Sequence, residues 1–160
     1  MSQKLKKVSI IIRALNEGRW INSCLNAIKN QVYKNFEIIL IDNYSTDNTV
    51  EKAKKFDVKI IKIKDYFPGA AINLGVKNSN GEIIVCLSGH CIPKSKLWLG
   101  NLIRHLNNDK IAGVYGRQEH MDFSSNSDKR DLMIIFGEES RIQKKDTFFH
   151  NANSAFLKKT

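Results

Sequence analysis

The chain has 160 residues, 42% of them hydrophobic, which is enough for one packed core and argues against two separate domains. Lysine and arginine number 26 against 16 acidic residues, so the net charge is +10 and favours an anionic partner such as a nucleotide phosphate, a nucleic acid or a membrane surface. No stretch approaches the roughly 20 apolar residues of a membrane span, and no signal-peptide pattern is seen, so we expect a soluble protein.

Short β-branched runs alternate with segments of helical spacing along most of the chain. The strand-like runs fall at residues 8–13, 36–42, 58–63, 82–88 and 111–116. Helical spacing is found at residues 20–28, 50–56 and 98–106, and a later helix is predicted to carry Leu132, Ile135, Phe136 and Glu139. This alternation predicts an α/β fold of the Rossmann-like type, with a mainly parallel sheet and helices on both of its faces.

The three cysteines form no regular framework. Of Cys24, Cys86 and Cys91, two lie in or beside apolar runs, where a free thiol behaves as a small hydrophobic side chain. We therefore expect reduced cysteines and a cytoplasmic setting.

Polar residues follow four consecutive predicted strands. They are "RALNEG" (13–18), "DNYS" (42–45), "KDYFPGAAINLG" (64–75) and "SGHC" (88–91). Ligands of open α/β sheets bind beyond the carboxyl ends of the strands, so these segments predict one shared site. The first loop lacks the G-x-G-x-x-G fingerprint, and no G-x-x-x-x-G-K-[ST] loop occurs, which argues against nicotinamide enzymes and P-loop NTPases.

Three stretches together resemble one known family. They are "VSIIIRALNEGRWINSCLNAIKNQVYKNFEIILIDNYSTDNTVEKAKKF", "PGAAINLGVKNSNGEIIVCLSGHCIP" and "NANSAFLKK". In type, order and spacing they are similar to the family-two inverting glycosyltransferases with the GT-A fold, although residues 117–147 carry little of the likeness. The resemblance implies an enzyme that transfers a sugar from a nucleotide-diphosphate-sugar donor to an acceptor, such as a surface polysaccharide or a lipid-linked glycan.

The resemblance also implies roles for particular residues. Asp42 would accept a hydrogen bond from the base, Asn16 and Glu17 would contact base or ribose, and the loop and helix start at Gly69 and Asn73 would approach the nucleotide. The full predicted set of donor-binding residues is Ala14, Leu15, Asn16, Glu17, Asp42, Asn43, Gly69, Asn73, Ser88, Gly89 and His90. Taken singly, several of these residue types are also ordinary in turns and helix caps.

The positions that match the family's metal-binding D-x-D motif read Ser88, Gly89 and His90. A divalent cation, Mn or Mg, would prefer the missing carboxylates. His90 could ligate the metal in their place, or the site could be metal-free with His90 facing the diphosphate directly. A zinc site from Cys86, His90 and Cys91 is disfavoured because Cys86 is expected to point into the core.

The general base of an inverting transferase has no counterpart at the expected place in this chain. The family supplies an Asp or Glu after the stretch that matches "NANSAFLKK", whereas Glu138 and Glu139 precede it. We therefore expect residues 1–160 to form one donor-binding domain of a longer enzyme, with the base and acceptor site beyond Thr160. The alternative is a nucleotide-sugar-binding module without turnover.

The positive charge admits two further interpretations. Nucleic-acid binding is disfavoured because the lysines, such as Lys52, Lys59 and Lys64, are scattered and are not interleaved with an aromatic platform. Peripheral attraction to the anionic inner face of a membrane, where a lipid-linked acceptor could lie, is the more ordinary use of the charge.

Overall fold

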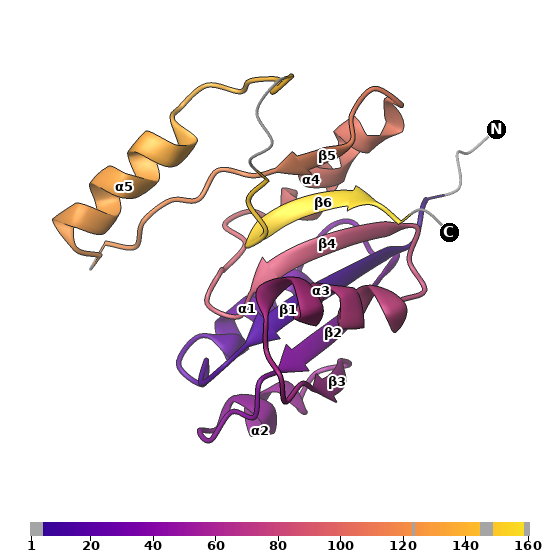
Figure 1. Cartoon of the computed structure of the whole chain (residues 1–160), viewed down its shortest axis with the longest axis vertical. Coiled ribbons are helices and arrows are strands. Elements are labelled where there is room, and N and C mark those ends of the chain that lie inside the picture. The colour runs from indigo at the N-terminus through magenta and orange to yellow at the C-terminus, as the bar shows by residue number, and fades with distance from the viewer. Residues whose placement is uncertain (1–4, 123, 145–148, 159–160) are drawn as a thin grey trace.

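A computed structural model describes residues 5–122, 124–144 and 149–158. Its centre is a six-stranded sheet with helices on both faces (Figure 1). The strands follow the order β3-β2-β1-β4-β6-β5 across the sheet. They span β1 (Val8–Ala14), β2 (Phe36–Asp42), β3 (Lys59–Lys62), β4 (Ile83–Ser88), β5 (Gly113–Tyr115) and β6 (Asn153–Leu157).

The predicted parallel sheet is confirmed for the first four strands. β1 pairs in parallel with both β2 and β4, and β2 pairs in parallel with β3. β6 is antiparallel to β4, and β5 is antiparallel to β6. Because β1 lies between β2 and β4, the loops that leave these three strands emerge side by side at the carboxyl edge of the sheet.

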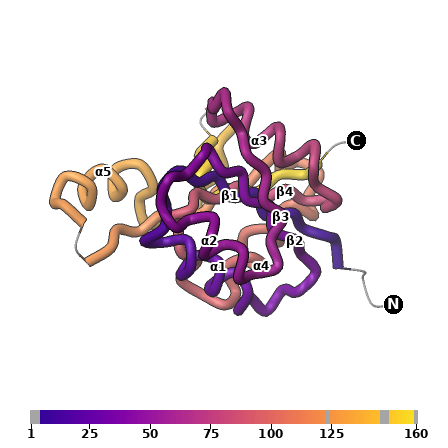
Figure 2. Tube along the Cα trace, turned by 90° about the horizontal axis from the view of Figure 1, so that it is seen from below, coloured from indigo at the N-terminus to yellow at the C-terminus, as the bar shows by residue number. Residues whose placement is uncertain are grey.

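Helices cover both faces of the sheet, as the alternation predicts. They are α1 (Ile21–Lys29), α2 (Thr49–Ala53), α3 (Pro68–Lys77), α4 (Trp98–Ile103) with its 3-10 extension η1 (Arg104–Asn107), and α5 (Asn126–Phe136). In Figure 2, α3 lies on one side of the strands while α1, α2 and α4 lie on the other. Among the described residues, no helix combines the length and the apolar character that crossing a bilayer requires.

The alternating side chains of β1 divide the core between the two faces. Ile10 and Ile12 pack with Leu25 of α1 and Leu99 of α4, whereas Ile11 packs with Ala71 of α3 on the opposite face. All of these side chains are fully buried. Burial on both faces explains why β1, β2 and β4 read as continuous apolar runs rather than as an alternating pattern.

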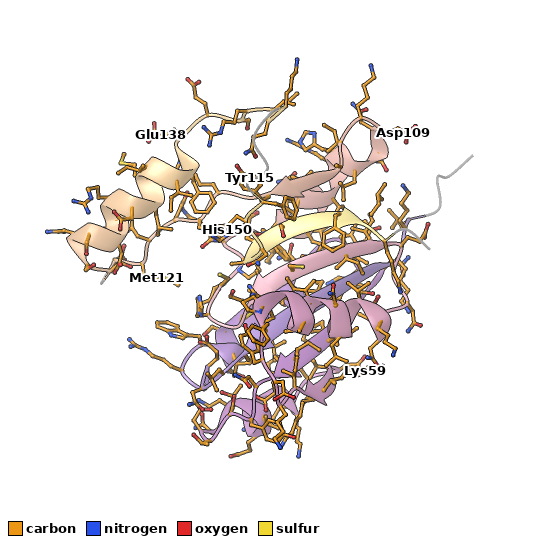
Figure 3. The ribbon with its side chains drawn as sticks, viewed as in Figure 1. Lys59, Asp109, Tyr115, Met121, Glu138 and His150 are labelled. Atoms are coloured by element: carbon orange, nitrogen blue, oxygen red, sulfur yellow. The ribbon has the colours of Figure 1, made fainter. Side chains whose placement is uncertain are left out.

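The last third of the chain departs from the sequence-based expectations. β5 is shorter than the predicted run at 111–116, and the later helix ends at Phe136, so Glu139 lies outside it. α5 has no buried residue and extends away from the sheet in Figure 1. Its Phe136 ring packs edge-on against the rings of Tyr115 and His150, both labelled in Figure 3.

Candidate functional site

The carboxyl ends of β1, β2 and β4 meet in register. Ala14 pairs with Asp42, and Arg13 pairs with Ser88 on the other side of β1. Beyond the strands, Asn43 N–H donates to Ala14 O at 2.9 Å, and Gly89 N–H donates to Arg13 O at 2.9 Å. The structure therefore brings together three of the four polar segments that the sequence predicts to share a site, those after β1, β2 and β4.

Asp42 is a fully buried carboxylate at the end of β2. The Ser45 backbone N–H approaches its Oδ1 and Oδ2 at 3.4 and 3.3 Å, which are long distances for a hydrogen bond to a charged oxygen. No ion pair to Asp42 is found within the described ranges. Since a buried carboxylate is costly unless its oxygens are well satisfied, Asp42 is suited to accept a hydrogen bond from a ligand.

Asn16 uses its side chain to hold two loops together. Its Oδ1 accepts from the Thr46 backbone N–H at 2.8 Å, and its own N–H donates to Ser45 Oγ at 2.9 Å. Its backbone is left-handed, with φ of 54°, a conformation that Asn tolerates better than most residues. Asn16 therefore positions the loops after β1 and β2 against each other, whether or not a nucleotide also contacts it.

Asp47 fastens the same two loops one step further on. Its Oδ2 accepts from Gly18 N–H at 2.8 Å, and its Oδ1 accepts from Thr49 N–H at 2.9 Å. The hydrogen bond from the Thr49 hydroxyl, together with these backbone donors, holds the pKa of Asp47 below its usual value. Asp47 therefore joins the loop after β1 to the first residue of α2.

Glu17 and His90 form a pair at the junction of the β1 and β4 loops. His90 Nδ1 lies 2.7 Å from Glu17 Oε1, and the side chains are 58% and 16% exposed, respectively. An ionised carboxylate only accepts, so the proton of this bond is on Nδ1 and Nε2 is left for a ligand. A Cβ added to Gly89 would lie 2.9 Å from Glu17 Cγ, so this approach requires the glycine between Ser88 and His90.

Ser88 and Arg13 meet at the end of β4. Arg13 Nη2 donates to Ser88 Oγ at 3.3 Å, to Asn151 Oδ1 at 3.0 Å and to Asn151 O at 3.2 Å. Sequence reasoning assigned no role to Arg13 or Asn151. The signal for Arg13 was present, because a charged residue ends an otherwise apolar strand, but only the strand register shows that it reaches Ser88.

The remaining predicted residues are arranged less tightly. Ala14 is buried and Leu15 is 52% exposed, as expected for a strand end and the loop beside it. Gly69 and Asn73 lie on exposed positions in the first two turns of α3, and a Cβ at Gly69 would meet nothing within 4 Å. In the part of the chain that the structure describes, no hydrogen bond joins either residue to the β1, β2 or β4 loops, so their contact with a nucleotide stays a prediction.

The protein side chains offer little for a divalent cation. Within residues 5–122, 124–144 and 149–158, no group of three His, Cys, Asp or Glu side chains is placed to hold a metal ion. The Ser88 hydroxyl already receives a bond from the Arg13 guanidinium, whose charge repels a cation. Cys86 lies in the core, where burial raises the pKa of its thiol to about 11, which disfavours the thiolate that zinc requires.

A cavity of about 280 Å³ lies at the opposite end of the sheet. Ile83 at the start of β4, Ile103 of α4 and Tyr33 are among the residues that line it. None of the predicted site residues lines this cavity. The candidate site is therefore the group of polar residues at the strand ends and lies apart from this cavity.

Comparison with known proteins agrees with the geometry of the strand ends. The chain is 35% identical over 127 residues to glycosyltransferase AglE of Haloferax volcanii, covering 74% of this chain and 41% of that protein. It is 31% identical over 122 residues to a dolichyl N-acetyl-alpha-D-glucosaminyl phosphate 3-beta-D-2,3-diacetamido-2,3-dideoxy-beta-D-glucuronosyltransferase of Methanococcus voltae, covering 68% of this chain and 38% of that protein. The chain thus spans about two fifths of the length of these relatives.

Solved structures share the fold at low sequence identity. Mannosyltransferase PcManGT from Pyrobaculum calidifontis, in complex with GDP-Man and Mn2+, has a TM-score of 0.71 at 18% identity over 95% of this chain and 44% of that one. TarS from S. aureus in complex with UDP-GlcNAc has a TM-score of 0.64 at 20% identity over 74% of this chain and 36% of that one. The family model described as Glycosyl transferase family 2 matches residues 9–159, and the chain belongs to this family.

Proposed function

We propose that this chain binds the nucleotide-diphosphate-sugar donor of an inverting glycosyltransferase. The observation that carries the proposal is the buried Asp42 carboxylate, which lies beside the end of β1 and, among the described residues, receives only long contacts from the Ser45 backbone N–H. In the reaction an acceptor hydroxyl oxygen bonds to the anomeric carbon. The bond from that carbon to the diphosphate oxygen breaks, the diphosphate leaves with the electron pair, and a general base takes the hydroxyl proton.

Asp42 is proposed to select the base of the donor. Uracil, thymine and guanine rings present N–H groups, and a carboxylate without other strong partners can accept from them. Burial strengthens such a bond because water does not compete for the oxygens. The loops after β1 and β2, which Asn16 and Asp47 hold together, would then form the walls on either side of the base.

The donor diphosphate is proposed to lie over Ser88, Gly89 and His90 at the end of β4. PcManGT is a neighbour whose complex contains Mn2+, which makes a divalent cation a natural expectation for the fold. The side chains at these three positions do not fit a cation on their own, because they include no carboxylate and Ser88 lies beside Arg13. His90 Nε2 would contact a metal through its lone pair, or donate to a phosphate oxygen when the imidazole carries a second proton.

The acceptor is proposed to be a glycan or lipid-linked sugar presented at the inner face of a membrane. The net charge of +10 would attract the chain to anionic lipid headgroups. The Methanococcus voltae relative carries in its name a dolichyl phosphate sugar as its substrate, which supports a lipid-linked acceptor. Sedimentation with anionic vesicles at low and high salt tests the membrane part of this proposal.

Calorimetric titration of UDP, GDP, dTDP and their sugars, with Mn, with Mg and with chelator, tests donor binding. We expect Asp42→Asn to weaken the affinity for the best-binding nucleotide by roughly 10- to 100-fold, the usual range for one hydrogen bond to a charged group. Asp57→Asn is the matched control, since Asp57 is exposed beyond α2. Equal affinities of Asp42→Asn and the unaltered chain would remove Asp42 from the base site.

A further inference from the structure

Arg13 is a charged side chain held within the carboxyl end of the sheet. It occupies the sixth position of β1, a strand paired on both sides, and pairs with Ile41 of β2 and Ser88 of β4. Its hydrogen bonds to Ser88 and Asn151 all come from one nitrogen, Nη2. The guanidinium is therefore anchored at one end, while its other N–H groups make no hydrogen bond to a described residue.

The charge of Arg13 is not balanced by the protein around it. No carboxylate in the described ranges forms an ion pair with it, and its Nε is a buried nitrogen without a hydrogen-bond partner. The positive charge of Arg13 also affects His150. Burial lowers the pKa of His150, and the charge of Arg13 lowers it further. A partly buried cation without a counter-ion is unfavourable, and an anionic ligand would relieve that cost.

We propose that Arg13 supplies the positive charge that faces the donor diphosphate, in the place where a D-x-D motif would hold a divalent cation. The inference rests on the proposed function, since it assumes that the donor lies over Ser88. The planar guanidinium matches two phosphate oxygens at once, and its charge does not depend on pH. Nη2 is 3.3 Å from Ser88 Oγ, so the cation stands at the strand end where the diphosphate is expected.

The same charge bears on the chemical step. When the bond from the anomeric carbon breaks, negative charge grows on the leaving diphosphate, and a fixed cation nearby stabilises that charge without reorganising. A divalent metal would do this in a D-x-D site. Here the cation is part of β1, so we expect donor binding to persist in the presence of chelator.

The test measures the affinity of Arg13→Gln for a nucleoside, its monophosphate and its diphosphate, all in chelator, using the base that the unaltered chain binds best. We expect diphosphate binding to weaken roughly 10- to 100-fold and nucleoside binding to stay unchanged. Inorganic pyrophosphate should compete with the diphosphate in the unaltered chain and lose that ability in the variant. Arg130→Gln on α5, with its side chain 70% exposed, is the matched control.

Arg13→Lys is a second variant that keeps the test informative if Arg13→Gln does not fold correctly, which a melting curve would reveal. The lysine keeps the positive charge but lacks the planar guanidinium that can donate to two phosphate oxygens at once. The diphosphate affinity of Arg13→Lys should therefore fall between those of the unaltered chain and Arg13→Gln. An unchanged diphosphate affinity in Arg13→Gln, or an equal loss of affinity for the nucleoside, would each overturn the role of Arg13. A chain that binds no nucleotide at all would instead overturn the proposed function.

Discussion

The pair between His90 Nδ1 and Glu17 Oε1 gives the sharpest prediction about how the site is built. If Glu17 orients the imidazole, the two residues must act as a unit on the donor diphosphate. The perturbation is a double-mutant cycle of Glu17→Gln, His90→Gln and the double variant. We expect Glu17→Gln to weaken nucleoside diphosphate binding in the unaltered background and to change it little once His90 is already replaced.

The size of the coupling follows from the geometry of the pair. A hydrogen bond to a charged group contributes about 1.5–3 kcal/mol where it is shielded from water. Glu17 is 16% exposed, but the His90 side chain is 58% exposed, and solvent weakens an exposed pair. We therefore expect a coupling of about 1 kcal/mol, which corresponds to roughly a fivefold difference in the dissociation constant.

The assay is calorimetric titration of the four proteins with the preferred nucleoside diphosphate in chelator, with melting curves to confirm that each is folded. Glu51→Gln, an exposed glutamate in the first turn of α2, serves as the control for loss of one negative charge. Additive effects, with Glu17→Gln costing the same in both backgrounds, would refute the idea that Glu17 acts through His90. A coupling of the expected size would support it.

Two further predictions concern the packing around the site. Gly75→Ala places a Cβ 2.5 Å from Ile11 Cγ2. The resulting overpacking costs about 1–3 kcal/mol, and the higher helix propensity of alanine offsets about 1 kcal/mol of that cost. We therefore expect the melting temperature to fall by a few degrees. Gly100→Ala on α4 should not lower the melting temperature, because a Cβ there meets nothing within 4 Å. An equal fall in the melting temperature of both variants would contradict the packing argument. Burial raises the pKa of Glu37, but hydrogen bonds, above all the one from Ser9, lower it, and the net effect is a pKa below the usual value. The ionised Glu37 therefore stabilises the folded state fully above about pH 4.3, and this contribution is lost as the pH falls through the pKa of the folded state. Urea unfolding at pH 7 and pH 3 should then show that Glu37→Gln destabilises the protein more at pH 7 than at pH 3, and an equal loss at both values would refute the linkage.

Much of the fold could be predicted because the buried parallel strands leave a strong signal. β1, β2 and β4 are apolar on both faces, so their runs are continuous and their ends are followed by polar loops. β6 could not be found in this way. Its buried positions include Asn153 and Ser154, and a strand whose inward residues are polar gives no apolar period to recognise.

The candidate site was predicted as a set of positions, but not as a set of contacts. Asp42, Glu17 and His90 could be named because each lies at or just after the end of a strand in a recognisable motif. Glu17 and His90 are in contact although 73 positions separate them in the sequence, and the hydrogen bond from Arg13 to Asn151 joins residues 138 positions apart. Such pairs are created by strand order and register, which no local pattern reports.

The position of Arg13 shows why motif matching alone gives an incomplete account of this site. A motif search compares the end of β4 with D-x-D and finds the carboxylates missing. The structure adds the neighbouring strand, where a cation stands beside Ser88. Carboxylates at the end of β4 would attract a divalent ion toward the diphosphate, but beside Arg13 they would instead pair with the guanidinium and cancel its charge. The neutral Ser88 and Gly89 are therefore consistent with Arg13, since the guanidinium remains available to an anionic ligand only if the end of β4, which it contacts, carries no carboxylate to pair with it.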